Sequence, residues 1–220
     1  MASFLVMCFA SLLVGSCAVA PPPPDTGQDI VLVKTRRLTE RWGPILGQAH
    51  HAVIDLREDG HWYRVAVDDA DSGAWIYPIT TEEALAEDYE GRPYTILQRI
   101  DGPRAGVVIA DLHREVARYA QTYHYGAWPG PNSNTFIEEM GRRVPGLRFD
   151  QHHDAFCKDY VAGIYIGSSA TGTGFSLETP VLGIQVGPVD GLELHLMSLT
   201  LGIQIWPPRL ELPFLPRIGS

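Results

Sequence analysis

A two-residue turn signal, Asp59-Gly60, constrains the fold of this chain more than any other feature. This dipeptide favours the tight type I′ turn that joins two antiparallel strands. The residues on either side alternate between apolar and polar, as expected for a hairpin with one buried face. With Asp59 and Gly60 as the loop, Glu58 faces His61, and this pairing fixes every other pair along the two strands.

That register sorts the side chains of the hairpin onto two faces. One face carries apolar pairs: Ala52 with Val67, Ile54 with Val65, and Leu56 with Tyr63. The other face carries favourable polar pairs and sets two candidate site residues opposite each other: Asp55 with Arg64, Arg57 with Trp62, and His51 with Asp68. A slip by one residue would mix the two sets.

Helical and strand patterns follow the hairpin. We expect a short helix over residues 81–88 capped by Thr80 or Thr81, a strand over 94–100, a long helix over 104–123 and a second helix over 135–144. Residues 28–46 fit either a helix or an extended arm.

From about residue 163 onward, glycine and strict alternation predict a three-stranded antiparallel meander. Its apolar character indicates either contact with a membrane or a sheet that covers the core, and we favour the latter. The whole pattern predicts one α+β domain over residues 28–220. A small antiparallel sheet would pack on two main helices and be followed by the C-terminal β-meander.

The composition is that of a globular protein, with 45% hydrophobic and 20% charged residues. The net charge of −9 comes from 26 acidic and 17 basic residues, and the basic residues form no run. Binding of nucleic acid needs clustered positive charge. We therefore expect no nucleic-acid partner.

The N-terminus has the pattern of an export signal. Residues 1–14 are apolar and uncharged, and the first basic residue is Lys34. Val-Gly-Ser-Cys at 14–17 resembles a bacterial lipobox, which predicts a signal peptide over 1–17 and a lipid on Cys17. Residues 18–27, with four consecutive prolines, would form a stiff linker. The alternative is an uncleaved anchor. Both predict a protein of the bacterial cell envelope, lipid-anchored or periplasmic.

A proline- and glycine-rich turn leads into the second predicted helix. The segment Trp-Pro-Gly-Pro-Asn-Ser-Asn-Thr-Phe at 128–136 places Ser133 near a helix N-terminus. Free backbone N–H groups there stabilise negative charge. The residues alone favour a purely structural reading, because Asn, Ser and Thr are preferred caps. Thr135 and Glu138 have the spacing of a capping box.

These nine residues are typical of a bacterial family called domain of unknown function 3750 (DUF3750), which the chain resembles. Further segments share the likeness: residues 43–47, 51–54, 158–160, 169–175, 191–194 and 208–213. The resemblance covers roughly residues 40–219. It implies a bacterial protein, commonly with a hydrophobic N-terminus, and no particular activity.

The order of the polar residues also resembles the permuted papain-like enzymes, such as NlpC-type peptidases and lecithin retinol acyltransferases. Those enzymes carry a histidine on an early strand, a polar partner on the next strand, and an Asn-Cys-x-x-Phe segment that opens a helix. His51, Asp68 and Asn132 follow in that order here, with Ser133 in place of the cysteine. A cysteine can be held as a thiolate, whereas a serine needs a base during attack.

This second resemblance implies an acyl hydrolase or transferase. Ser133 would attack, His51 would act as base and then acid, and Asp68 would orient His51. Asn132 or Asn134 would support the oxyanion. The expected substrates are amides or esters of the envelope, such as peptidoglycan peptides or lipids.

The alternative is a catalytically inactive binding or structural protein of the envelope, in which the segment Asn132-Ser133-Asn134 caps a helix. The sequence does not decide between the two. A separation of Ser133 and His51 within about 4 Å would favour the enzyme.

No cofactor is expected and no metal site is singled out. The spacing of His50, His51 and His61 matches no standard zinc motif. Neighbouring residues of a strand also point to opposite faces, which separates His50 from His51. His152 and His153 form a second cluster with Cys157, a residue that we interpret as packing because lone cysteines are often buried.

Overall fold

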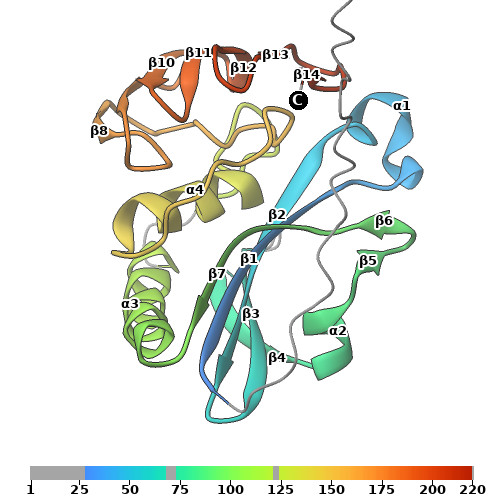
Figure 1. Cartoon of the computed structure of the whole chain (residues 1–220), viewed down its shortest axis with the longest axis vertical. Coiled ribbons are helices and arrows are strands. Elements are labelled where there is room, and N and C mark those ends of the chain that lie inside the picture. Colours follow the sequence, from blue (N-terminus) through green and yellow to red (C-terminus); the bar gives the residue numbers. More distant parts are fainter. Residues whose placement is uncertain (1–27, 68–72, 121–123, 220) are drawn as a thin grey trace, which may run out of the picture.

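The structure is a computed structural model that describes residues 28–67, 73–120 and 124–219 (Figure 1). The predicted signal segment with Cys17, the proline-rich linker and Asp68 lie outside the described residues. The described part is an α+β fold with a five-stranded antiparallel sheet, two main helices and a C-terminal meander of strands. The predicted fold class is thereby confirmed.

The five-stranded sheet has the order β4-β3-β2-β1-β7. Its strands are β1 (Ile30–Arg37), β2 (His50–Glu58), β3 (His61–Val67), β4 (Ala74–Ile79) and β7 (Thr95–Asp101). Residues 30–37 thus take the extended form of the two predicted for the N-terminal arm. They form a strand between β2 and β7 whose first six residues are buried.

The hairpin of β2 and β3 has the register that Asp59-Gly60 predicts. Glu58 lies opposite His61, and the ladder runs to the pair Ile54 and Val65. Beyond that pair, the first residues of β2 are held from the other side by β1, where Arg36 lies opposite His51. The start of β2, which carries His51, is therefore paired with β1 but lies beyond the end of its ladder with β3.

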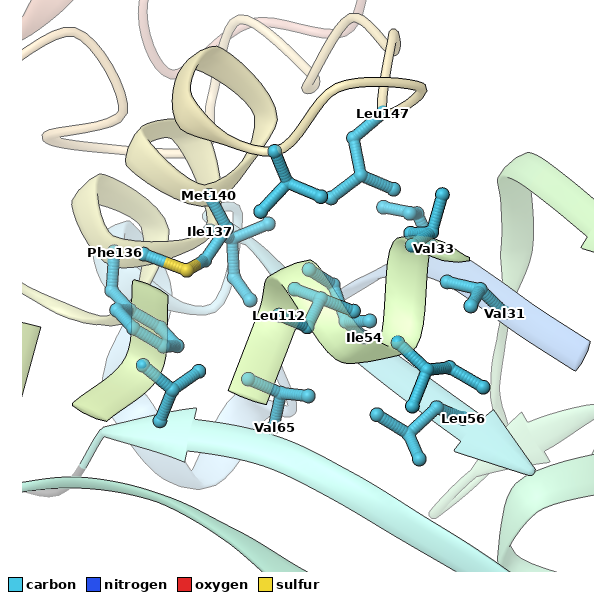
Figure 2. Packing of buried hydrophobic residues seen from close by; sticks show 14 of the residues in the cluster. Val31, Val33, Ile54, Leu56, Val65, Leu112, Phe136, Ile137, Met140 and Leu147 are labelled. Carbon is cyan, nitrogen blue, oxygen red and sulfur yellow. The ribbon is translucent and has the colours of Figure 1, made fainter. Parts of the chain in front are cut away.

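Two helices cover one face of this sheet, α3 (Pro103–Ala120) and α4 (Ser133–Arg143). Pro103 suits the first position of a helix, where its missing N–H is not needed. Apolar side chains from both helices and the sheet form the main core, which Figure 2 shows around the labelled residues Val31, Ile54, Leu112, Phe136 and Met140. All five are at most 2% exposed, so the helices are fixed firmly on the sheet.

Smaller elements cover the opposite face and the connections. Helix α2 (Thr81–Leu85) is shorter than the predicted 81–88, and its cap is Thr80, one of the two caps predicted. The Glu83 carboxylate accepts a reciprocal bond from the Thr80 N–H. The helix packs Ala84 near Ile30, Leu32 and Trp62 in a second apolar cluster. The remaining short elements of this part are η1 (Glu40–Trp42), α1 (Gly43–Leu46), β5 (Asp88–Tyr89) and β6 (Arg92–Pro93).

The C-terminal meander is a seven-stranded antiparallel sheet, larger than the three strands expected. Its strands are β8 (Tyr165–Ser168), β9 (Phe175–Glu178), β10 (Leu182–Gly187), β11 (Gly191–Leu196), β12 (Leu199–Gln204), β13 (Arg209–Glu211) and β14 (Ile218–Gly219). The three predicted strands are β10 to β12, and shorter strands extend both edges. Figure 1 shows this sheet at one end of the molecule, above α4.

The two faces of the C-terminal sheet have an unusual polarity. Polar side chains point inward and are buried, among them Glu178, Gln185, Glu193 and His195. Apolar side chains of the same strands point outward and are exposed, among them Ile184, Leu192, Leu194, Leu201 and Ile203. No helix among the described residues is long and apolar enough to cross a membrane.

Candidate functional site

Ser133 and His51 meet, although 82 positions separate them in the chain. The Ser133 Oγ atom lies 3.2 Å from the His51 Nδ1 atom, within the distance of a hydrogen bond. Ser133 is the first residue of α4 and His51 is the second residue of β2. The packing of α4 on the sheet therefore creates the pair.

The start of α4 lies two residues earlier than the sequence predicts, and its cap is Asn132. The Asn132 Oδ1 atom accepts from the backbone N–H groups of Asn134 and Thr135. Thr135 returns a bond, because its Oγ1 accepts from the Asn132 N–H at 3.1 Å. The predicted capping box of Thr135 and Glu138 is thus wrong, because Thr135 is the third residue of the helix and Glu138 lies beyond the first turn.

Asn134 joins the start of α4 to the strand that carries His51. Its Oδ1 atom accepts from the Ala52 N–H at 3.2 Å, and its Nδ2 atom donates to the His50 carbonyl at 3.0 Å. A further bond goes from Nδ2 to the carbonyl of Phe156 at 3.2 Å. Backbone groups on both sides of His51 are therefore bonded to one buried side chain, which holds the Ser133–His51 distance.

The loop before the C-terminal sheet holds the same helix end. The Asn132 Nδ2 atom donates to the Phe156 carbonyl at 3.3 Å, and the Thr135 hydroxyl donates to the Cys157 carbonyl at 2.6 Å. The amide groups of Asn132 and Asn134 are thus engaged in positioning. Their support of an oxyanion stays a prediction. The Ser133 N–H is the first-turn donor that the Asn132 cap does not use.

The surroundings of His51 keep its imidazole neutral. Burial, followed by the positive charges of Arg36 and Arg64, lowers the pKa of His51 to about 4. A neutral imidazole at physiological pH can accept a proton from a serine hydroxyl. His51 is therefore in its proton-accepting form, with a pKa below the value near the working pH at which a general base is most effective. Asp68, the predicted third member of the group, lies outside the described residues.

A cavity of about 230 Å³ opens beside this pair. Both Ser133 and His51 line it, together with the side chains of Arg36, Arg64, Tyr77, Tyr89 and Tyr94. Such a volume is below the roughly 300–1,000 Å³ typical of drug-sized ligands. It would hold one small chemical group next to the serine.

The other histidines considered in the sequence, and Cys157, lie outside this site. His50 points away from His51 and stacks on His152, with the ring centroids 3.6 Å apart. His61 lies exposed at the hairpin tip, bonded to the carbonyl of its neighbour Asp59. Cys157 is buried, and burial raises the pKa of its thiol to about 12. This environment disfavours a nucleophilic thiolate.

Two groups of side chains in the described part of the chain bring metal-ligand atoms together: His152, His153 and Asp154, and Asp159, Glu193 and His195. In the second, the Lys158 ammonium lies 2.9 Å from Asp159 and 3.0 Å from Glu193. This group therefore contains its own cation. In the first, His153 bonds the Leu215 carbonyl at 3.1 Å and His152 accepts from the Asp154 N–H. These hydrogen bonds already use a ring nitrogen of each histidine that a metal ion would need.

Taken together, the described chain is an α+β protein with a Ser–His pair at the junction of a strand end and a helix N-terminus. The chain belongs to the DUF3750 family, described as proteins of unknown function, whose family model matches residues 39–160. That range contains His51, Asp68 and Ser133 and ends before the C-terminal sheet begins. No curated protein matches the chain, and no solved structure does.

Sequence reasoning missed the cationic and aromatic lining of the cavity. Arg36 stands opposite His51 only because β1 pairs with β2. Arg64 was predicted from the hairpin register, but only as the partner of Asp55, which it contacts at 2.7 and 3.0 Å. If residues 30–37 had been predicted as a strand paired with residues 50–58, Arg36 would have been placed opposite His51.

Proposed function

We propose that this protein is an acyl hydrolase or acyltransferase with Ser133 as nucleophile and His51 as base. The single observation that carries the proposal is the 3.2 Å contact between Ser133 Oγ and His51 Nδ1. The cap of α4 is complete without the Ser133 side chain, because Asn132 and Thr135 supply it. The hydroxyl of Ser133 is therefore available for chemistry.

The reaction follows from the geometry of the pair. His51 Nδ1 would take the hydroxyl proton as Oγ attacks the carbonyl carbon of an amide or ester. The tetrahedral oxyanion would form near the N-terminus of α4, where the Ser133 N–H and the helix dipole favour negative charge. His51 would then pass the proton to the leaving amine or alcohol, which departs as the C–N or C–O bond breaks. Water or a second acceptor would release the acyl group from Ser133.

The second candidate is a catalytically inactive protein that uses the same cavity for binding. What favours it is the engagement of both asparagine side chains, Asn132 and Asn134, in structural hydrogen bonds. These side chains hold the helix end in place whether or not a reaction follows. The two candidates differ in the reactivity of Ser133 alone.

We further propose that the protein works at the bacterial cell envelope. The support is the apolar, uncharged segment of residues 1–14, followed by the lipobox-like sequence that ends at Cys17. Substrates met there include amides and esters of peptidoglycan peptides and of lipids. Anchoring by a lipid on Cys17, or by the uncleaved segment, would keep the cavity near them.

Labelling with an uncharged alkyl fluorophosphonate tests the reactivity of Ser133. We expect the wild-type chain to be labelled, because the probe phosphorylates a serine activated by a neighbouring base. The variants Ser133→Ala and His51→Gln should lose at least about 100-fold in labelling rate, in keeping with the contribution of a general base. Intact-protein mass spectrometry would measure the rate and the site.

Two control variants change the same residue types outside the site. Ser168→Ala alters an exposed serine on β8, and His61→Gln alters the exposed histidine at the hairpin tip. Both should be labelled at the wild-type rate. A wild-type chain that is folded yet unlabelled, or labelling that persists in Ser133→Ala, would favour the inactive binding protein.

A further inference from the structure

The described residues that line the cavity beside Ser133 carry an unbalanced charge. Two guanidinium groups, from Arg36 and Arg64, line it, and no carboxylate is among its lining residues in the described part of the chain. Arg64 forms a bidentate bond with Asp55. Lys34 also contacts Asp55 at 2.7 Å, so one buried carboxylate faces two cations. Arg36 is the cation that remains without an acidic partner among the described residues.

Arg36 is held in place by aromatic and backbone contacts. Its guanidinium lies over the ring of Tyr89 at 4.1 Å and farther from Tyr94, at 6.0 Å. One weak bond at 3.4 Å goes to the carbonyl of Arg37. The Arg36 Nε atom is buried and has no hydrogen-bond partner among the described residues. An unpaired buried donor of this kind is costly unless a ligand satisfies it.

We infer that the cavity binds an anionic group of the substrate, a carboxylate or a phosphate, through Arg36. Planar guanidinium groups pair with both anions through parallel hydrogen bonds. Arg36 stands opposite His51 in the sheet, so the anion would lie within a few atoms of the bond that Ser133 attacks. The substrate class becomes a short acyl amide or ester with a negative charge near the scissile bond. This inference rests on the proposed function for the role of Ser133, but not for the binding of the anion.

The electrostatics of His51 agree with an anion in this position. Besides burial, Arg36 and Arg64 hold the pKa of His51 down. A bound anion would offset these charges and raise the pKa of His51 toward neutrality. A general base works best with a pKa near the working pH. Binding of an anionic substrate would therefore make His51 a more efficient base.

Protection from fluorophosphonate labelling tests the inference. Glutarate and inorganic phosphate are the anionic probes, and glutaramide is an uncharged match for glutarate. We expect glutarate, phosphate or both to slow the labelling of Ser133, and glutaramide to have no effect. Protection by glutarate alone would identify a carboxylate, and protection by phosphate alone would identify a phosphate.

In the variant Arg36→Gln, the anion concentration that halves the labelling rate should be at least about tenfold higher than in the wild type. In Arg36→Lys this concentration should lie between the two. Arg118→Gln is the matched control, because Arg118 is 62% exposed, pairs with Glu115 on α3 and does not line the cavity. Protection by neither anion, or protection that Arg36→Gln leaves unchanged, would overturn the inference. If the wild-type chain is not labelled by the fluorophosphonate even without an added anion, that result would instead count against the proposed function. In that case, binding of glutarate or phosphate is measured by chemical shifts of the His51 ring.

The outer face of the C-terminal sheet carries a second, independent inference. Residues 161–219 contain seven ionisable residues of the types Asp, Glu, Lys, Arg and His, and none of them is exposed. The exposed strand residues of β10 to β12 are instead apolar: Leu182, Ile184, Val186, Leu192, Leu194, Leu196, Leu201 and Ile203. Trp206, which follows β12, is 81% exposed. The chain therefore keeps its charges away from this face.

We propose that this face docks on the acyl chains of a lipid bilayer. Interfaces between proteins are only partly apolar and keep a polar rim with hydrogen bonds. A sheet that is apolar outward and polar inward has the pattern of lipid-facing strands. An exposed tryptophan beside such a surface is typical of a membrane interface. The apolar residues 1–14 give the same chain a second feature directed at a membrane.

Quenching of tryptophan fluorescence by brominated lipids tests this proposal on the full chain. Vesicles of phosphatidylcholine with brominated acyl chains should quench the wild type, and Trp206→Phe should remove most of that quenching. The double variant Leu194→Glu with Ile203→Glu places charges on the face and should abolish the quenching that depends on Trp206. An N-terminal anchor alone would not bring Trp206 into contact with the acyl chains.

The matched control is Val107→Glu, which places a charge on an exposed apolar position of α3, where Val107 is 63% exposed. It should be quenched like the wild type. Equal quenching in Trp206→Phe and wild type would overturn the proposal. So would a dimer in lipid-free solution that Leu194→Glu with Ile203→Glu dissociates, because a second copy would then cover the face.

Discussion

At the scale of single residues, the site depends on a histidine whose charge is suppressed. His51 is partly covered, lies opposite Arg36 and shares a cavity with Arg64. Each of these surroundings disfavours the imidazolium form. The residue that could activate Ser133 is therefore neutral over a wide range of pH, and this has a measurable consequence.

We predict that fluorophosphonate labelling of Ser133 stays nearly constant from pH 7.5 down to about pH 5.5, within about twofold. The reason is that the pKa of His51 lies at about 4, so its basic form persists through this range. An ordinary histidine would lose most of its basic form on the same descent, because its pKa is about 6.5. A midpoint near 6.5 in the labelling profile would contradict the prediction. The variant Arg36→Gln should move the acid midpoint upward, because it removes a positive charge.

At the scale of elements, one contact fixes α4 relative to β2. The Asn134 side chain bonds the backbone at His50 and at Ala52, so it clamps the strand on either side of His51. Asn132, its neighbour, belongs to the cap of the helix. The two asparagines thus have separable roles, although the sequence presents them as a pair flanking Ser133.

We predict that Asn134→Ala lowers the free energy of unfolding by about 1–3 kcal/mol, because it leaves buried backbone groups unpaired. It should also slow the labelling of Ser133 at least about tenfold, because α4 loses its fixed distance from β2. Asn132→Ser is the control, since serine keeps a capping oxygen and should change stability by less than about 1 kcal/mol. Denaturant unfolding and labelling rates measure both effects. Equal behaviour of the two variants would rule out the clamp.

At the scale of the whole molecule, buried charges join residues 39–160, which the family model matches, to the C-terminal sheet. Lys158 pairs with Asp159 and with Glu193 of β11, and both partners are nearly inaccessible. His195, also on β11, lies 2.9 Å from Glu178 and 3.3 Å from Asp159. The sheet is therefore attached through ion pairs on its polar inner face, which leaves its apolar face outward.

We predict that Lys158→Met lowers the free energy of unfolding by about 3–5 kcal/mol, the usual effect of removing one partner of a buried ion pair. Asp159 and Glu193 would lose the ammonium group that lies 2.9 and 3.0 Å from them. Arg41→Met, which removes an exposed ion pair with Glu90, should cost less than about 1 kcal/mol. Urea denaturation of both variants gives the comparison. A small effect of Lys158→Met would mean that the network contributes little to stability.

The same network predicts a loss of stability in alkali. Burial alone would lower the pKa of His195, but Asp159 and the bonds to Glu178 and Glu193 outweigh it and raise the pKa to about 9. An unfolded histidine has a pKa of about 6.5. The folded state therefore binds more protons between these values, so this contribution is complete below pH 6.5 and is lost as the pH rises through about 9. Urea unfolding at pH 6.5, 8 and 9 measures the loss, and the ring resonances of His195 should titrate near pH 9. A midpoint near 6.5 would show that the carboxylates do not hold the proton.

What the sequence determined by itself is local. Asp59-Gly60 set the hairpin register, Thr80 and Glu83 capped α2, and the alternation after residue 163 marked strands, because each signal acts through neighbouring backbone groups. The sequence also placed His51 and Ser133 on a strand and at a helix start. Only tertiary packing decided that these two residues meet, that Arg36 stands beside them, and which face of the C-terminal sheet is outward. These features arise from contacts between elements far apart in the chain, and alternation alone is the same for a sheet facing either way.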